Sequence, residues 1–105
     1  MTPFPFSLLT PSGALLNEEA VFVGLRSIEG SFGILARHAP IVAACPPGVV
    51  RVQRASGWSY YATTSAILST DGHKVVVLTD RAENAQDEIT ARQIAQQWQQ
   101  EAREE

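Results

Sequence analysis

The chain has 105 residues, of which 45% are apolar, and a formal net charge of −3. This length allows one domain with one core. The eight Lys and Arg residues are scattered instead of forming a basic tract, which argues against a nucleic-acid partner. No apolar stretch approaches the ~20 residues that span a bilayer, so direct membrane insertion is not expected.

The first 30 residues predict three short strands. Apolar residues alternate over 4–8, which is typical of a strand with one buried face, and Thr10 to Gly13 supply turn chemistry. Residues 14–18 and 20–26 predict two more strands, before Ser27 to Gly30 breaks the pattern.

The stretch Gly30 to Pro40, GSFGILARHAP, is less regular, and an apolar run over 41–45 follows it. Cys45, the single cysteine, ends that run, so it is expected to pack as a small apolar side chain in a reducing compartment. Pro46-Pro47-Gly48 then predicts a chain reversal in a type II turn, because Gly48 can take a positive φ.

Two hairpins are predicted in the next 30 residues. Residues 49–54 and 58–63 flank the turn residues Ala55 to Gly57. Residues 67–70 and 73–78 flank Asp71-Gly72, a pair that suits a type I′ turn. Seven to ten short strands with no helix between them predict a mainly β fold, an antiparallel sandwich or barrel.

The composition changes after Thr79, and helix formers dominate from Asp87, a predicted N-cap, to the end of the chain. One apolar stripe lies at helical spacing, formed by Ala91, Ile94, Ala95, Trp98 and Ala102. A helix this short is marginal alone in water, so Ile94 and Trp98 are expected to dock on the sandwich, a partner subunit or a second copy. We therefore divide the chain into a β domain, 1–84, and a C-terminal helix, 85–105.

Little in the sequence indicates chemistry. His38, His73 and Cys45 are isolated, which argues against a metal site, and there is no phosphate-binding GxxxxGK[ST]. We therefore assign no catalytic, metal-binding or cofactor-binding residue, and a binding or structural protein is favoured over an enzyme.

Two rival hypotheses from other classes remain. One is a small sandwich that binds a ligand in a pocket lined by Trp58, Tyr60 and Tyr61. The other is an enzyme that uses His38 and Cys45 as a nucleophilic pair, although apolar neighbours would raise the pKa of the thiol.

Read in order, three segments resemble the epsilon subunit of F-type rotary ATP synthases, which is called delta in mitochondria. They are Gly30 to Leu35, His38-Ala39-Pro40 and Gly48 to Val52. Thr10 to Gly13 and Val75 to Ala82 occupy the places of two further family motifs. The resemblance covers about Phe4 to Ala82.

The resemblance implies a β-sandwich of two antiparallel sheets, here with about ten short strands followed by one helix. It also implies a non-catalytic rotor part that links the gamma shaft to the c-ring, for proton- or sodium-coupled ATP synthesis or hydrolysis. Such a subunit lies on the cytoplasmic side of a bacterial membrane, in the F1 sector. Within the family, the alternative is an accessory rotor subunit of a second, specialised ATPase.

The resemblance also implies contact residues. The expected c-ring contacts are Ser31, Phe32, Gly33, Arg37, His38, Ala39 and Pro40, and the expected gamma contacts are Thr10, Ile41, Val42 and Ala43. Among the residues of the stretch, Phe32 and Ile34 are favoured as core, since large apolar residues are so often buried. A weak homodimer is expected in isolation, through the face that the two partners would cover.

The sequence departs from the family pattern at four places. Ala36-Arg37 replaces a frequent Pro-Gly, which predicts a less rigid and more charged loop, and Ser31 replaces a frequent acidic residue. Ser65-Ala66 stands where a glycine pair is common, which calls into question any positive φ there. One helix stands in place of a two-helix hairpin, so weak or absent ATP binding and inhibition of hydrolysis are expected.

Overall fold

The structure is a computed structural model that describes residues 1–104. Its ten strands are β1 (Phe4–Thr10), β2 (Gly13–Ala20), β3 (Phe22–Ser27), β4 (Gly30–Ile34), β5 (Ile41–Cys45), β6 (Gly48–Arg54), β7 (Gly57–Thr63), β8 (Ala66–Thr70), β9 (Val75–Thr79) and β10 (Ala82–Ala85), and one helix follows, α1 (Glu88–Glu104). Within residues 1–104, no helix is long and apolar enough to cross a membrane.

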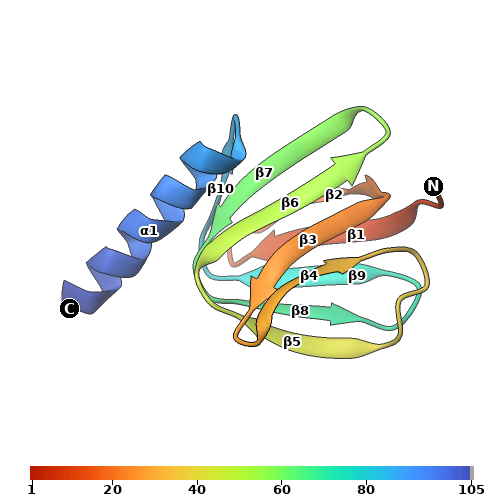
Figure 1. Cartoon of the computed structure of the whole chain (residues 1–105), viewed down its shortest axis with the longest axis horizontal. Helices are drawn as coiled ribbons and strands as arrows, with labels where there is room; N and C mark the ends of the chain where they lie inside the picture. The colour runs from red at the N-terminus through yellow and green to blue at the C-terminus, as the bar shows by residue number, and fades with distance from the viewer. Residues whose placement is uncertain (105) are drawn as a thin grey trace.

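The strands form two five-stranded sheets that pack face to face, with α1 beside one of them (Figure 1). Sheet A has the order β2-β1-β9-β8-β5, and sheet B has the order β10-β7-β6-β3-β4. Alternate residues of each strand face inward, and the most deeply buried are Phe6, Leu8, Leu68 and Val77 from sheet A and Val23, Ile34, Val50 and Val52 from sheet B. The predicted mainly β sandwich with a C-terminal helix is confirmed.

One pairing differs from the predicted antiparallel pattern. β1 lies between β2 and β9, antiparallel to β2 but parallel to β9, with Phe6 opposite Val75 and Leu8 opposite Val77. The chain alternates between the two sheets, so β1 and β9 meet after a long excursion and run in the same direction. The turn residues in the sequence are local signals, so they do not predict that β1 and β9 become neighbours.

The predicted hairpin at Asp71-Gly72 forms, but the predicted type I′ turn is wrong. That turn needs a positive φ at both central residues, and of the two only Gly72 has one, at 95°. The Asp71 Oδ1 atom instead accepts hydrogen bonds from the backbone N–H groups of His73 (2.9 Å) and Lys74 (3.0 Å). An aspartate that binds its own downstream backbone makes a wider, four-residue connection.

The predicted type II turn at Pro46-Pro47-Gly48 is also wrong. Gly48 has no positive φ and is the first residue of β6. β5 belongs to sheet A and β6 to sheet B, so the chain turns a corner between sheets instead of reversing within one. Proline biases the residue before it toward extended conformations, which suits such a corner.

The backbone at Ser65-Ala66 does not require glycine, because neither residue has a positive φ. Ala66 begins β8 and is buried. The Thr79 hydroxyl donates to the carbonyl oxygens of Thr64 (3.3 Å) and Ser65 (3.1 Å). This hydroxyl fixes the corner where β7 crosses to β8.

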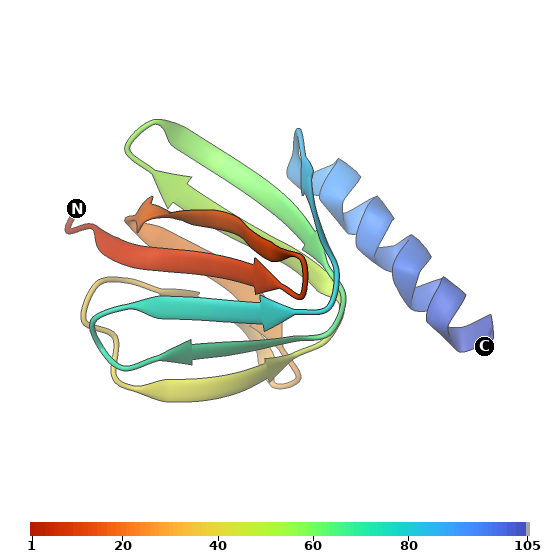
Figure 2. The same ribbon diagram turned by 180° about the vertical axis from the view of Figure 1, so that it is seen from behind.

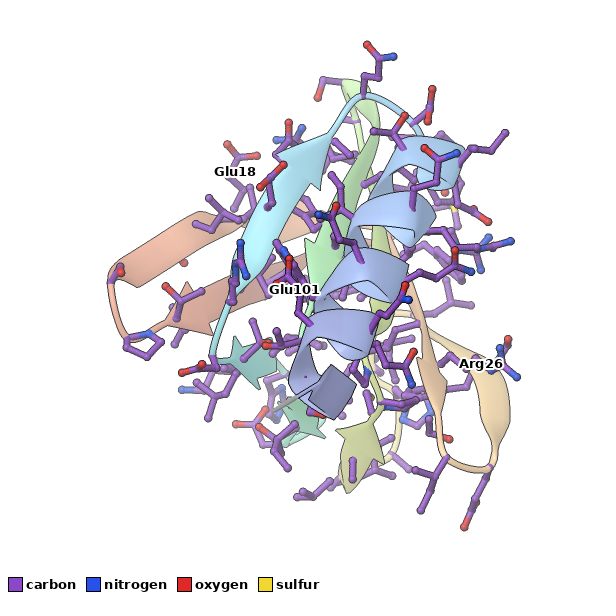
Figure 3. All side chains as sticks on the ribbon, turned by 90° about the vertical axis from the view of Figure 1, so that its left-hand side faces the viewer. Glu18, Arg26 and Glu101 are labelled. Atoms are coloured by element: carbon purple, nitrogen blue, oxygen red, sulfur yellow. The ribbon has the colours of Figure 1, made fainter. Side chains whose placement is uncertain are left out.

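α1 covers part of the outer face of sheet B (Figure 3). In that view Glu101 lies on the helix, and Arg26 lies on β3, to one side of the helix. Ala91, Ala95 and Trp98 are buried against Ala62 and Ala85. Ile94 is half-buried at the border of this contact, and Ala102 is exposed. Of the three surfaces considered for the stripe, the sandwich is the one that it contacts in the structure.

Charged groups bind α1 near both of its ends. The Asp87 Oδ1 atom accepts a hydrogen bond from the Thr90 N–H (2.7 Å), which caps the helix and lowers the pKa of the Asp87 carboxyl. Arg81 lies over the Trp98 ring, 4.3 Å from its centroid, and 3.7 Å from the Glu101 carboxylate. Because β10 runs to Ala85 and α1 packs on the same sheet, the division at 84/85 stays a prediction.

Candidate interaction surfaces

The stretch GSFGILARHAP forms β4 and the loop 35–40 that leads to β5. Its two glycines serve different purposes. Gly30 has a φ of 131° at the end of the β3–β4 turn, a conformation that side chains disfavour. The Ser27 hydroxyl donates to the Gly30 carbonyl (3.2 Å) and closes this turn, at whose tip Ile28 is 80% exposed.

Gly33 gives space to an aromatic ring. Gly33 and Gly24 are opposite each other in β4 and β3, and the Phe22 ring lies over both. A Cβ atom on Gly33 would lie 2.5 Å from a Phe22 ring carbon, which is shorter than any van der Waals contact between carbons. Trp58 packs edge-on against Phe22, with 5.8 Å between ring centroids, so this cluster holds β4 to the rest of sheet B.

The loop 35–40 is an ordered structure. Arg37, which stands where the family often has glycine, has a φ of 62°, in the left-handed region that glycine tolerates best. The His38 N–H donates to the Leu35 carbonyl (3.2 Å), and His38 Nδ1 lies 2.7 Å from the Ala39 carbonyl oxygen. Since a carbonyl can only accept, Nδ1 carries the proton.

The structure brings most of the predicted contact residues to one side of the sandwich. A groove of about 450 Å³ lies between the edge strands β4 and β5. It is lined by Ser31, Phe32, His38, Ile41, Val42 and Ala43, together with Ser27, Glu29 and Gly30. Three predicted c-ring contacts and three predicted gamma contacts therefore line the same groove, whereas Gly33, Arg37, Ala39, Pro40 and Thr10 do not line it.

The predicted contact residues differ in how exposed they are. Ser31, Gly33, Arg37, Ala39, Pro40 and Val42 are exposed, whereas Phe32 and Ile41 pack against the core. Ile34 is fully buried, as favoured, but its neighbour Leu35 is 51% exposed. Thr10 is in β1, three strand positions from β5 in sheet A, which corresponds to ~14 Å.

The outer face of sheet A carries an apolar row that the sequence analysis missed. The row crosses all five strands through residues paired side by side, namely Ala14, Leu9, Leu78, Ile67 and Ala44. Ile67 is 45% exposed and Leu78 49% exposed, and Val42 at the sheet edge is 75% exposed. Within residues 1–104, no other element covers this face (Figure 2). The signal was present in strands that are apolar on both sides, such as VVVL in β9.

The ligand-binding hypothesis does not agree with the structure. Trp58 and Tyr60 stack on the outer face of sheet B, with 6.4 Å between ring centroids. Tyr61 faces the opposite way and is buried in the core. Because neighbouring residues of a strand point to opposite faces, these three rings cannot line one pocket.

The paired-nucleophile hypothesis fails on distance. His38 lies before the start of β5 and Cys45 is its last residue, and the strand between them has a length of ~13 Å. Burial raises the pKa of the Cys45 thiol, which disfavours the thiolate. Among residues 1–104, no group of three His, Cys, Asp or Glu side chains could hold a metal ion.

Residues 3–85 match the family described as ATP synthase, Delta/Epsilon chain, beta-sandwich domain. The chain belongs to this family. The match covers all ten strands of the sandwich and ends before α1, and it confirms the resemblance of the epsilon motifs.

Several relatives are ATP synthase epsilon chains. The chain is 31% identical over 86 residues to that of Desulforudis audaxviator, covering 82% of this chain and 63% of the relative. It is 33% identical over 82 residues to the sodium ion specific epsilon chain of Propionigenium modestum (78% and 60%) and 36% identical over 83 residues to that of Ruminiclostridium cellulolyticum (79% and 62%). The chain thus spans about three fifths of the length of these relatives.

Two solved assemblies contain chains with the same fold. One is the mitochondrial ATP synthase of Euglena gracilis, OSCP/F1/c-ring, with a TM-score of 0.74, 23% identity and coverage of 80% of this chain and 54% of that one. The other is the central stalk/c-ring of the Tetrahymena thermophila mitochondrial ATP synthase, with a TM-score of 0.66, 15% identity and coverage of 78% and 66%. At these identities the likeness supports the fold.

Proposed function

We propose that this chain is a non-catalytic rotor subunit of an F-type ATP synthase, in which the sandwich links the gamma shaft to the c-ring. In this role it would couple proton- or sodium-driven rotation to ATP synthesis or hydrolysis. It would lie on the cytoplasmic side of a bacterial membrane, as part of the F1 sector. Membership of the family supports this proposal, and so do the central-stalk and c-ring assemblies that contain chains of similar fold.

The uncovered apolar row of sheet A carries the proposal. Single exposed apolar residues are common, but a contiguous row marks a surface that a partner covers. We assign this face to the gamma subunit, with Leu78 and Ile67 near its centre and Val42 at its edge. Thr10, Ile41 and Ala43 would then border the contact instead of forming it.

The loop 35–40 and the exposed part of β4 are proposed to meet the c-ring. Arg37, Ala39 and Pro40 project from an internally hydrogen-bonded loop, and Ser31 lies on the neighbouring edge strand. A loop fixed in this way transmits torque without storing much of it as strain. In isolation, the uncovered faces leave the chain free to form a weak homodimer.

The proposal is tested by co-purification with a matching gamma subunit, followed by titration of the pair. We expect a one-to-one complex. Leu78→Lys should raise its dissociation constant at least tenfold. Ile89→Lys, a matched control at a 71% exposed position on α1, should leave the dissociation constant unchanged. Arg37→Glu should leave gamma affinity unchanged and weaken association of the gamma pair with the c-ring. A folded chain that binds no gamma subunit would contradict the rotor role.

A further inference from the structure

The two sheets of the sandwich end in four edge strands, β2 and β5 in sheet A and β10 and β4 in sheet B. An edge strand offers unpaired N–H and C=O groups that another strand can bind, unless charge, proline or cover protects it. β2 carries Glu18 and Glu19, and β10 carries Glu83 and contacts α1. These two edges are protected by charge or by the helix.

The remaining edges lie on the same side of the sandwich and have no charged residue. β4 reads GSFGI and β5 reads IVAAC. The two glycines make β4 a poor template for strand addition, whereas Ile41 and Val42 give β5 high strand propensity. Val42 is 75% exposed, and the groove of about 450 Å³ separates β5 from β4. β5 is therefore the edge best suited to accept another strand.

We propose that β5 pairs with β5 of a second copy of this chain, antiparallel and about a two-fold axis at Ala43. In this register Val42 faces Ala44 of the second copy, and Ile41 faces its Cys45. Directly opposite residues of antiparallel strands share a face, so Val42 and Ala44 remain on the outer face of sheet A. The two sheets would join into one of ten strands.

The sequence of β5 makes a second copy the fitting occupant. A two-fold interface brings the same surface of each copy together, so it must be self-complementary. β5 has only apolar residues, and those at the proposed axis are small alanines. Pairing β5 with itself therefore brings no like charges together. Self-pairing of β2 would bring Glu18 and Glu19 close to the same residues of the other copy, which is destabilising.

Two prolines limit the pairing at the ends. In the proposed register Pro40 lies opposite Pro46 of the second copy, and neither residue has an N–H to donate. The ladder therefore ends there without leaving a donor unpaired. The short ladder limits the affinity, so the dimer would form reversibly, and it would cover the edge strand at which the apolar row of sheet A ends.

The oligomeric state of the whole chain, without any partner, tests this inference independently of the rotor role. By sedimentation equilibrium over a concentration series, we expect a monomer–dimer equilibrium whose dissociation constant rises at least tenfold in Val42→Lys. Leu15→Lys, which adds the same charge at the opposite edge strand of sheet A, should leave the constant unchanged. A chain that stays monomeric, or a dimer that Val42→Lys does not weaken, would overturn the proposal.

Oxidative cross-linking tests the register itself. In a Cys45→Ala background, the double variant Val42→Cys/Ala44→Cys places a thiol opposite a thiol on both sides of the axis, within the geometry of a disulfide. Each single variant lacks the opposing thiol. We expect a covalent dimer from the double variant only. Equal cross-linking of a single variant would exclude this register.

Discussion

At the scale of single residues, the two glycines of GSFGIL show how one motif can contain two physical requirements. Gly30 is needed for its positive φ at the end of a turn, whereas Gly33 is needed because the Phe22 ring occupies the space of a side chain. The sequence indicated that the glycines allow bending or close approach. It could not identify Phe22 as the group that approaches, because Phe22 belongs to another strand.

Gly33→Ala should lower the free energy of unfolding by about 1–3 kcal/mol, the range for overpacking a well-filled site. Gly48→Ala is the control, since a Cβ there would meet its nearest atom at 3.7 Å, and its effect should stay within about 0.5 kcal/mol. Chemical denaturation measures both. In a Phe22→Ala background the Gly33→Ala change should cost much less, and equal costs in both backgrounds would contradict the ring contact.

Arg37 adopts a left-handed conformation that glycine would reach with less strain. Arg37→Gly should therefore stabilise the chain by about 0.5–1 kcal/mol. The backbone strain that it relieves, about 1–2 kcal/mol, exceeds the cost of the extra conformational freedom that glycine gives the unfolded chain. Arg37→Ala removes the charge but keeps the strain, so it should give no gain. Thermal melting compares the three chains, and a gain in the alanine variant would show that charge, not conformation, decides.

At the scale of elements, α1 explains an irregularity in the sequence. Residues 49–54 alternate imperfectly because Val49 lies on the outer face of sheet B yet packs against the helix. β10 was not predicted from the sequence because its residues, AENA, have low strand propensity. The edge of β7 nevertheless pairs with it through four residues, so tertiary context overrides propensity.

Trp98 is expected to hold α1 on the sandwich. Trp98→Ala should cost about 3 kcal/mol, as for other buried large-to-small changes, and release the helix, which is marginal alone. Far-ultraviolet circular dichroism should lose helical signal while the sandwich stays folded. Ile89→Ala, at an exposed position of the same helix, is the control, and an unchanged helical signal in Trp98→Ala would contradict the docking described here.

Acid should loosen the start of α1. The Thr90 N–H holds the pKa of the Asp87 carboxyl below its ordinary value, so the ionised form is favoured in the folded chain. The resulting stability is present above the unfolded pKa of about 3.9 and is lost as the pH falls through the lower folded pKa. Asp87→Asn keeps the accepting oxygen without titrating, so its melting temperature should fall less below about pH 4. The Asp71 pKa is lowered in the same direction, so both chains should retain some acid sensitivity.

At the scale of the whole molecule, the sequence predicted the sandwich, nearly every strand and the helix, because alternation and turn residues are local signals. The pairing of strands is not local. The apolar row on sheet A exists only because β1, β9, β8 and β5 lie side by side, so residues from distant parts of the chain share one surface. For the same reason the predicted gamma set contained Val42 but not Leu78 or Ile67, which belong to the face that we propose for the gamma subunit.

The central place of β1 in sheet A has a consequence for biosynthesis. β1 pairs with β9, 69 residues later by the pairing of Phe6 with Val75. At roughly 5–20 residues per second, a ribosome needs roughly 3–14 s to make that interval. During that time the β1–β2 hairpin is available while its neighbour in the sheet does not yet exist. The nascent sandwich can close only after β9 has been made, and until then β1, with its buried residues Phe6 and Leu8, is an apolar segment that a chaperone could shield.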